Sequence, residues 1–177
     1  MLFRSLAQLL HNELDLRSQR RPELRYGGAV ESVTVRGVPE LLLRALRNAL
    51  DNAERHAINV VDASLRQVDD SAEVTVSNDG AAIAPGDRDR VFQPFVRLDE
   101  SRSVDSGGTG LGLAIVADIL RAHGGSAEFI DPPEGLSTTL CLRLPAAPRL
   151  NDWSPPTPNE SHAELASPVD TSASAVE

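Results

Sequence analysis

Length, composition and charge limit what this chain can be. It has 177 residues, 41% of them hydrophobic but only 3% aromatic, so a core would be built from aliphatic side chains, and its formal net charge of −9 argues against a nucleic-acid partner. The one cysteine, Cys141, excludes an internal disulfide, no apolar run reaches bilayer length and no signal-peptide pattern opens the chain, so we expect a cytoplasmic domain without a membrane segment.

The first third of the chain predicts helix, two short strands and helix. Residues 5–20 carry apolar residues at helical spacing, and we interpret His11 within this helix as a surface histidine. Residues 24–28 and 32–36 predict two short strands joined around a glycine pair. A second helix is predicted over residues 39–56, because proline suits its first turn and leucines and alanines recur at the spacing of one buried face.

A polar stripe runs along this second helix. Asn48, Asn52, Arg55 and His56 fall at i, i+4, i+7 and i+8, so they share one face. Asparagine is locally unfavourable inside a helix, because its side chain competes for backbone hydrogen bonds. Amide oxygens suit Mg²⁺, while amide N–H groups and guanidinium suit phosphate. The stripe therefore fits a polyphosphate with its metal, and the alternative is an ordinary solvated helix face.

A strand pair and a polar turn follow. Residues 59–68 and 72–77 alternate as strands, and continuing the second alternation places Asn78 on the same side as the core residues Val74 and Val76. The side chain at this buried strand end, followed by Asp79 and Gly80, could read the edge of a flat ring. Ordinary turn chemistry is the alternative.

The glycine-rich segment 107–112 is the strongest local signal for function. It follows a short helical stretch at 86–93 and a polar loop at 97–106 expected to be mobile, and it opens an apolar helix predicted over residues 110–123. Free N–H groups at a helix start behind glycines suit phosphate oxygens. A P-loop is excluded because the chain has no lysine, and the Rossmann spacing is absent. A flexible linker before a buried helix is the alternative.

The chain closes with two strands and a segment of different composition. Residues 127–130 and 138–144 predict strands around a Pro-Pro-Glu-Gly turn, and a proline ends the last one. From residue 146 the sequence is rich in proline, serine, threonine and acids. We therefore expect a folded domain over residues 1–145 and a disordered tail over 146–177.

Taken in order, these segments resemble the ATP-binding catalytic domain of sensor histidine kinases, in the GHKL superfamily of ATPases and kinases. Residues 46–56 resemble the N box, residues 78–83 the first glycine box and residues 91–97 the F box. Residues 107–116 resemble the second glycine box, with 121–125 after it, and residues 138–140 resemble the closing strand of the adenine pocket. The order and spacing fit over residues 5–145.

The resemblance implies an α/β (α+β) two-layer sandwich of the Bergerat type, with a mixed sheet covered on one face by helices. ATP and Mg²⁺ would bind between the helices, under a lid formed by residues 96–107. Asn52 would ligate Mg²⁺ and, with Arg55, serve catalysis, and Asn78 would read the adenine amino group. The residues implied in ATP binding are Asn48, Asn52, Arg55, His56, Asn78, Gly80, Ala82, Ile83, Arg97, Gly108, Thr109, Gly110, Leu111, Gly112, Leu113 and Thr138.

Three departures from the family pattern matter. Asn78 stands where the family usually has aspartate, so its bond to adenine would lack charge assistance and nucleotide affinity would be weaker. Ala82 replaces the second glycine of the first box. The chain also lacks an H box, meaning a phosphoacceptor histidine followed by an acid and an Arg-x-Pro pattern. We therefore expect a C-terminal fragment, or a module that acts in trans.

Three functions compete at this point. The first is an ATP:protein-histidine phosphotransferase module of a two-component system, whose partners would be a phosphoacceptor histidine domain and, downstream, a response regulator. The second is an anti-sigma-factor type of serine kinase, which has a similar fold without an H box. The third is a degenerate nucleotide-binding module that regulates a partner.

Overall fold

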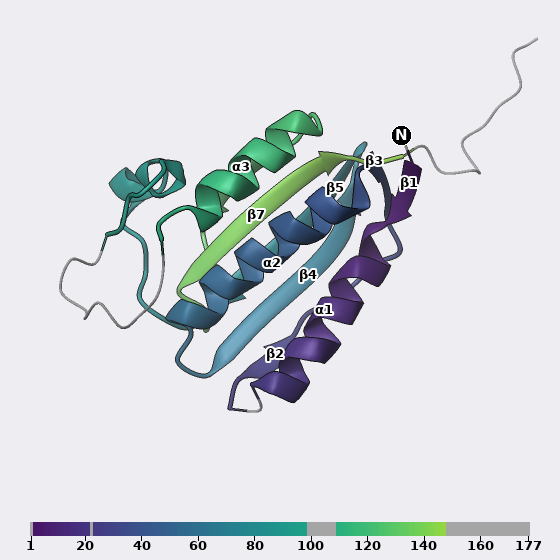
Figure 1. The fold of residues 1–177 in the computed structure, drawn as a ribbon. Helices are drawn as coiled ribbons and strands as arrows, with labels where there is room; N and C mark the ends of the chain where they lie inside the picture. The colour runs from purple at the N-terminus through teal and green to yellow at the C-terminus, as the bar shows by residue number, and fades with distance from the viewer. Residues whose placement is uncertain (1, 22, 99–108, 148–177) are drawn as a thin grey trace, which may run out of the picture. The chain divides into compact units, whose positions relative to one another are not determined.

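The computed structural model describes residues 2–21, 23–98 and 109–147. Three helices pack on one face of a sheet and form a two-layer domain (Figure 1). The helices are α1 (Leu6–Arg20), α2 (Pro39–His56) and α3 (Gly112–Ala122), and η1 (Pro85–Asp87) and η2 (Arg90–Phe92) are short 3₁₀ turns. The strands are β1 (Leu2–Ser5), β2 (Arg25–Gly27), β3 (Thr34–Gly37), β4 (Val60–Val68), β5 (Ser71–Asn78), β6 (Ser126–Ile130) and β7 (Thr138–Pro145).

The main sheet is mixed, as the resemblance implies. Its strand order is β2-β4-β5-β7-β6, in which β2 runs parallel to β4 and the other neighbours are antiparallel. A separate two-stranded sheet pairs β1 with β3. Because β5 lies in the centre, its C-terminal end is held between β4 and β7, and Asn78 pairs in register with Val61 on one side and Thr138 on the other.

The helices form where the sequence predicts them. Ser5 caps α1, since its Oγ accepts the N–H of Gln8 at 3.3 Å. Helix α2 has Pro39 in its first turn and matches its predicted bounds. Its apolar face packs into an aliphatic core with the inner faces of β4, β5 and β7. The α2 residues in that core are Leu42, Ala45, Leu46, Ala49, Leu50 and Ala53.

The open face of the sheet carries a ladder of ion pairs across its strands. Glu73 on β5 accepts from Arg66 on β4 at 2.9 Å and from Arg143 on β7 at 2.7 Å, and Arg143 also pairs with Glu128 on β6. Glu73 thus faces away from Val74 and Val76, which lie in the core, so the predicted alternation of β5 is confirmed.

The strands predicted at 24–28 and 32–36 form as β2 and β3, in different sheets, because β2 joins β4 and β3 joins β1. Strand β1 is an element that the sequence does not predict. Two expectations need correction. The helical stretch predicted over 86–93 consists of η1 and η2, and α3 begins at Gly112 instead of residue 110, because Gly110 has φ +69°, outside the helical region.

Two predictions fall largely outside the described residues, namely the loop over 97–106 and the tail over 146–177. Of the predicted tail, Ala146 and Ala147 are described, and their N–H groups donate to the carbonyls of Asp70 and Thr34. Within the part of the chain that is described, no helix is long and apolar enough to cross a membrane.

Candidate nucleotide-binding site

The predicted polar stripe lies on α2 where this helix packs beside α3. Asn48 is half-buried, and a β-carbon at Gly112 would lie 3.9 Å from its Oδ1, so the N-box helix and the end of the glycine loop meet here. The Nδ2 atom of Asn48 is buried and has no hydrogen-bond partner among the described residues. A buried amide without a partner is costly in a folded protein, so this donor suits an oxygen of a bound ligand.

The end of the glycine loop is fixed by the F-box segment. Gly110 accepts the N–H of Phe95 at 3.0 Å, and a β-carbon at Gly110 would lie 2.9 Å from Phe95 Cα. Leu111, which precedes α3, has no side-chain acceptor for the first-turn N–H groups. Among the described residues no side chain caps these donors, and the backbone dipole at a helix start favours an anion. Gly108, the first glycine implied in phosphate binding, lies outside the described residues.

The first glycine box begins at the end of β5 and lies against the last residue of α2. Asn78 is only 2% exposed, and its Oδ1 accepts the N–H of Gly80 at 3.0 Å. A β-carbon at Gly80 would lie 1.8 Å from the carbonyl oxygen of His56, so only glycine fits. Thr138 Oγ1 donates to the carbonyl of Ala81 at 3.1 Å. The Oδ1 atom of Asn78 therefore stabilises the turn. Because an amide oxygen has two lone pairs, the same atom can accept a second hydrogen bond.

Asp79 has a structural role that its sequence context does not predict. Its carboxylate accepts the backbone N–H groups of Ile58, Asn59 and Val60 at 2.9–3.0 Å and so joins the first glycine box to the segment after α2. Partial burial alone would raise the pKa of Asp79, but these donors outweigh it and lower the pKa to about 2. An aspartate in an Asn-Asp-Gly turn was the only signal, and its partners lie about 20 residues earlier.

The remaining predicted residues differ in how exposed they are. Ile83 is partly buried against the core. The exposed ones are Arg55, His56, Ala82, Arg97 and Thr109. Leu113 packs against the core from the first turn of α3. The described residues thus bring together Asn48 with Gly112 and His56 with Gly80, whereas the roles implied for Arg97 and Arg55 stay predictions.

A second feature that the sequence did not predict is an ionic cluster between α1 and α2. Arg17 Nη1 lies 2.7 Å from both Glu54 and Asp51, and Tyr26 donates its hydroxyl to Glu54 at 2.8 Å. Burial and the Glu54 carboxylate raise the pKa of Tyr26. The cluster anchors the C-terminal half of α2, on the helix that carries Asn52.

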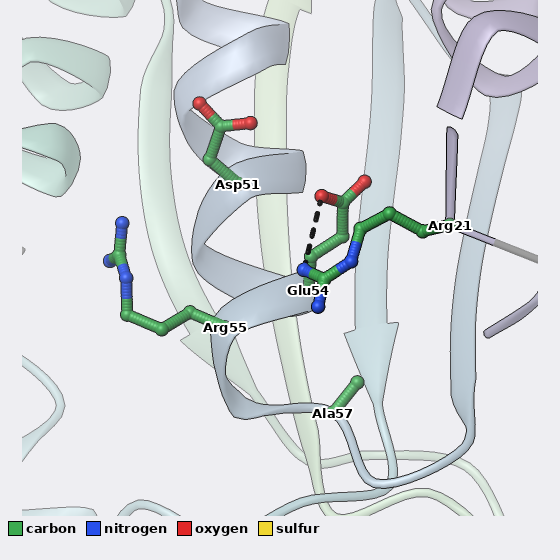
Figure 2. Close-up of a pocket in the computed structure, with 5 residues that line it drawn as sticks. All are labelled: Arg21, Asp51, Glu54, Arg55 and Ala57. Carbon is green, nitrogen blue, oxygen red and sulfur yellow. Dashed lines mark ion pairs between the residues drawn. The ribbon is translucent and has the colours of Figure 1, made fainter. Parts of the chain in front are cut away.

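A cavity lies beside this cluster (Figure 2). Arg21 reaches toward Glu54, at 3.8 Å, whereas the side chain of Arg55 extends away from that pair. The residues that line the cavity are Arg21, Asp51, Glu54, Arg55 and Ala57.

The residues present fit a magnesium–nucleotide ligand. Among the described residues no group of three His, Cys, Asp or Glu side chains could hold a metal. Mg²⁺ that is bound with a polyphosphate needs only one or two protein oxygens, because the phosphates and water supply the rest. Asn48, whose amide lies beside Gly112, and the half-buried Asn52 one turn further along α2 are the asparagines that could supply such an oxygen.

The match to known proteins agrees with this geometry. Residues 37–148 match the family of histidine kinase-, DNA gyrase B- and HSP90-like ATPases, and the chain belongs to this family. Within the family, the similar proteins are sensor histidine kinases, as the sequence predicted.

Three comparisons illustrate this similarity. Sensor histidine kinase CpxA of Escherichia coli strain K12 is 40% identical over 109 residues, which are 62% of this chain and 24% of CpxA. The histidine-protein kinase/phosphatase MprB of Mycobacterium ulcerans is 34% identical over 172 residues, 94% of this chain and 33% of MprB. A solved structure of the mycobacterial sensor histidine kinase MprB superposes with a TM-score of 0.73 at 29% identity, covering 84% of this chain and 99% of that one.

These matches favour the histidine-kinase hypothesis over the anti-sigma type of serine kinase. The chain spans about a quarter to a third of the length of the curated relatives named above. The predicted mixed sheet with helices on one face is confirmed both by the topology and by the superposition.

Proposed function

We propose that this chain binds Mg²⁺-ATP and transfers the γ-phosphate to a histidine on a separate phosphoacceptor domain. The observation that carries the proposal is the unpartnered, buried Nδ2 of Asn48 beside Gly112, at the junction of the N-box helix and the second glycine box. A response regulator would receive the phosphoryl group afterwards, and the reaction would take place in the cytoplasm.

The side chains of α2 would divide the work on the nucleotide. Asn52 would offer its amide oxygen to Mg²⁺, and Asn48 and Arg55 would donate to phosphate oxygens. The bound ion would neutralise charge on the transferring phosphate. Backbone N–H groups of Gly110, Leu111, Gly112 and Leu113 would hold the phosphates without a side chain in the way.

Phosphoryl transfer needs mainly positioning and charge stabilisation from the protein. The bond between the γ-phosphorus and the β–γ bridging oxygen breaks, a bond to an imidazole nitrogen of the partner histidine forms, and ADP leaves. This chain would supply the nucleotide side, and the partner would supply the nucleophile with its own base.

The test compares Asn52→Ala with the control Asn12→Ala, an exposed asparagine on α1 that interacts with Gln8. Calorimetric titration with a non-hydrolysable ATP analogue, with and without Mg²⁺, measures binding. Radiolabelled ATP with a purified phosphoacceptor domain measures transfer. We expect Asn52→Ala to lose Mg²⁺-dependent binding and transfer, while Asn12→Ala keeps both.

Three outcomes would contradict the proposal. Unchanged binding and transfer in Asn52→Ala would remove the central assignment. A phosphorylated product that survives mild acid would indicate serine instead of histidine, because phosphohistidine is acid-labile. Absence of binding at millimolar nucleotide would favour the degenerate regulatory module.

A further inference from the structure

His123 bridges the two helices of the proposed site at the end away from the nucleotide. It follows the last residue of α3, and its Nδ1 lies 2.7 Å from the carbonyl oxygen of Ile119. Its Nε2 lies 3.1 Å from the backbone nitrogen of Val38, the residue that precedes α2. One imidazole thus joins the C-terminus of α3 to the N-terminus of α2.

The two partners fix the protonation state of the ring. The Ile119 carbonyl can only accept, so Nδ1 must carry a proton, and the Val38 N–H can only donate, so Nε2 must offer a lone pair. Only the neutral tautomer with hydrogen on Nδ1 satisfies both. A second proton on Nε2 would set two donors against each other and abolish the bond to Val38.

Val38, the residue that donates to His123 at the start of α2, has no polar side chain that could replace this bond. The valine side chain of Val38 cannot cap the helix, and its carbonyl accepts the N–H groups of Leu41 and Leu42 that begin α2. The ring also packs closely on Gly37, where a β-carbon would lie 2.8 Å from His123 Cδ2. Any loss of the bond therefore acts directly on the first turn of α2.

The C-terminal cap of α3 sets the ring in place. Gly124 has φ +74° and donates to the Arg121 carbonyl at 3.0 Å, and Gly125 donates to the Leu120 carbonyl at 2.8 Å. Beyond this cap the chain enters β6, so the ring is held between a closed helix end and a strand.

We propose that His123 is a positioning residue: in its neutral form it fixes α3 along α2, and so fixes Gly112 relative to Asn48 at the opposite end of α3. This inference rests on the proposed nucleotide site. Helix α3 has 11 residues, so it transmits a shift at His123 to the glycine loop as a short rigid rod. Loss of this contact would therefore weaken nucleotide binding.

The segments that hold the ring carry several charged residues. Glu40 lies in the first turn of α2, and Arg36 precedes Gly37 on β3 and has an interaction of its own. Arg121 pairs with Asp118 at 2.8 Å, and Arg143, whose carbonyl lies beside Gly125, pairs with Glu73 and Glu128. The hydrogen bond that Nε2 makes within the described residues is the one from the Val38 N–H.

Two amide substitutions separate the two bonds of the ring. His123→Gln places an amide oxygen near the Nε2 position and can accept from Val38 at every pH. His123→Asn places its amide group near the Nδ1 position, so it keeps the Ile119 contact and loses the Val38 contact.

The binding experiment is calorimetric titration with a non-hydrolysable Mg²⁺-ATP analogue at pH 7.5. We expect His123→Asn to bind about fivefold more weakly than the parent, which is the effect of one lost hydrogen bond. His123→Gln, which keeps an acceptor for the Val38 N–H, should match the parent.

A second measurement does not depend on nucleotide. Long-range ¹⁵N spectra of the histidine rings and hydrogen exchange of the Val38 amide should show the Nδ1–H tautomer at pH 7.5 and faster exchange in His123→Asn. The opposite tautomer, parental affinity in His123→Asn, or an equal loss of affinity in His123→Gln would each overturn the inference. If no variant binds nucleotide while the tautomer and exchange are as expected, the proposed function fails but the bridge between the helices holds.

Discussion

Replacing Asp79 with asparagine tests whether this carboxylate anchors the first glycine box to the segment after α2. The pKa of Asp79 falls from an ordinary value of 3.8 to about 2. At about 1.36 kcal/mol for each pH unit, that shift sets an upper limit of about 2.4 kcal/mol on the stabilisation that comes from ionisation. Asp79 is only half-buried. Solvent screening therefore lowers our expectation to about 1 kcal/mol.

The pH dependence has a definite sign. Because the folded-state pKa lies below the unfolded one, the stabilisation is fully present above about pH 5 and is lost as the pH falls through 4 toward 2. Urea unfolding of the parent, Asp79→Asn and the exposed control Asp15→Asn at pH 7, 5 and 3 measures this. We expect the deficit of Asp79→Asn to be about half as large at pH 3 as at pH 7. Equal stability at pH 7, or a deficit that does not shrink at pH 3, would refute the reasoning.

Two further substitutions test the elements that hold the site. Gly80→Ala should cost about 1–3 kcal/mol and weaken nucleotide binding, because its β-carbon would overlap the His56 carbonyl, whereas Gly86→Ala, which meets no atom within 4 Å, should change neither property. Glu54→Ala should cost about 3 kcal/mol in urea unfolding by leaving Arg17 with less countercharge, against about 1 kcal/mol for Tyr26→Phe. Parental binding by Gly80→Ala, or equal losses in the Glu54 and Tyr26 variants, would contradict these assignments.

The sequence alone determined the elements whose signals are local. Pro39 and the helical spacing of leucines define α2 within its own 18 residues, and the alternation of Val74 and Val76 defines the inner face of β5. The glycines at 110 and 112, followed by an apolar run, likewise indicate the start of a helix before any contact is known.

Tertiary structure decided whatever depends on partners distant in sequence. Glu54 and Arg17 are 37 residues apart. Their sequence neighbours do not indicate that the two side chains form an ion pair between α1 and α2. From the sequence, Asp79 is only a turn residue, and the fold adds the N–H groups of Ile58 and Asn59 as its partners. Likewise, His123 lies at the end of a predicted helix, and the fold places it beside Val38, which is 85 residues earlier. Side-chain periodicity is a property of one segment. The protonation state of a side chain and the strength of its hydrogen bonds depend instead on which donors and acceptors the folded chain brings within hydrogen-bond distance.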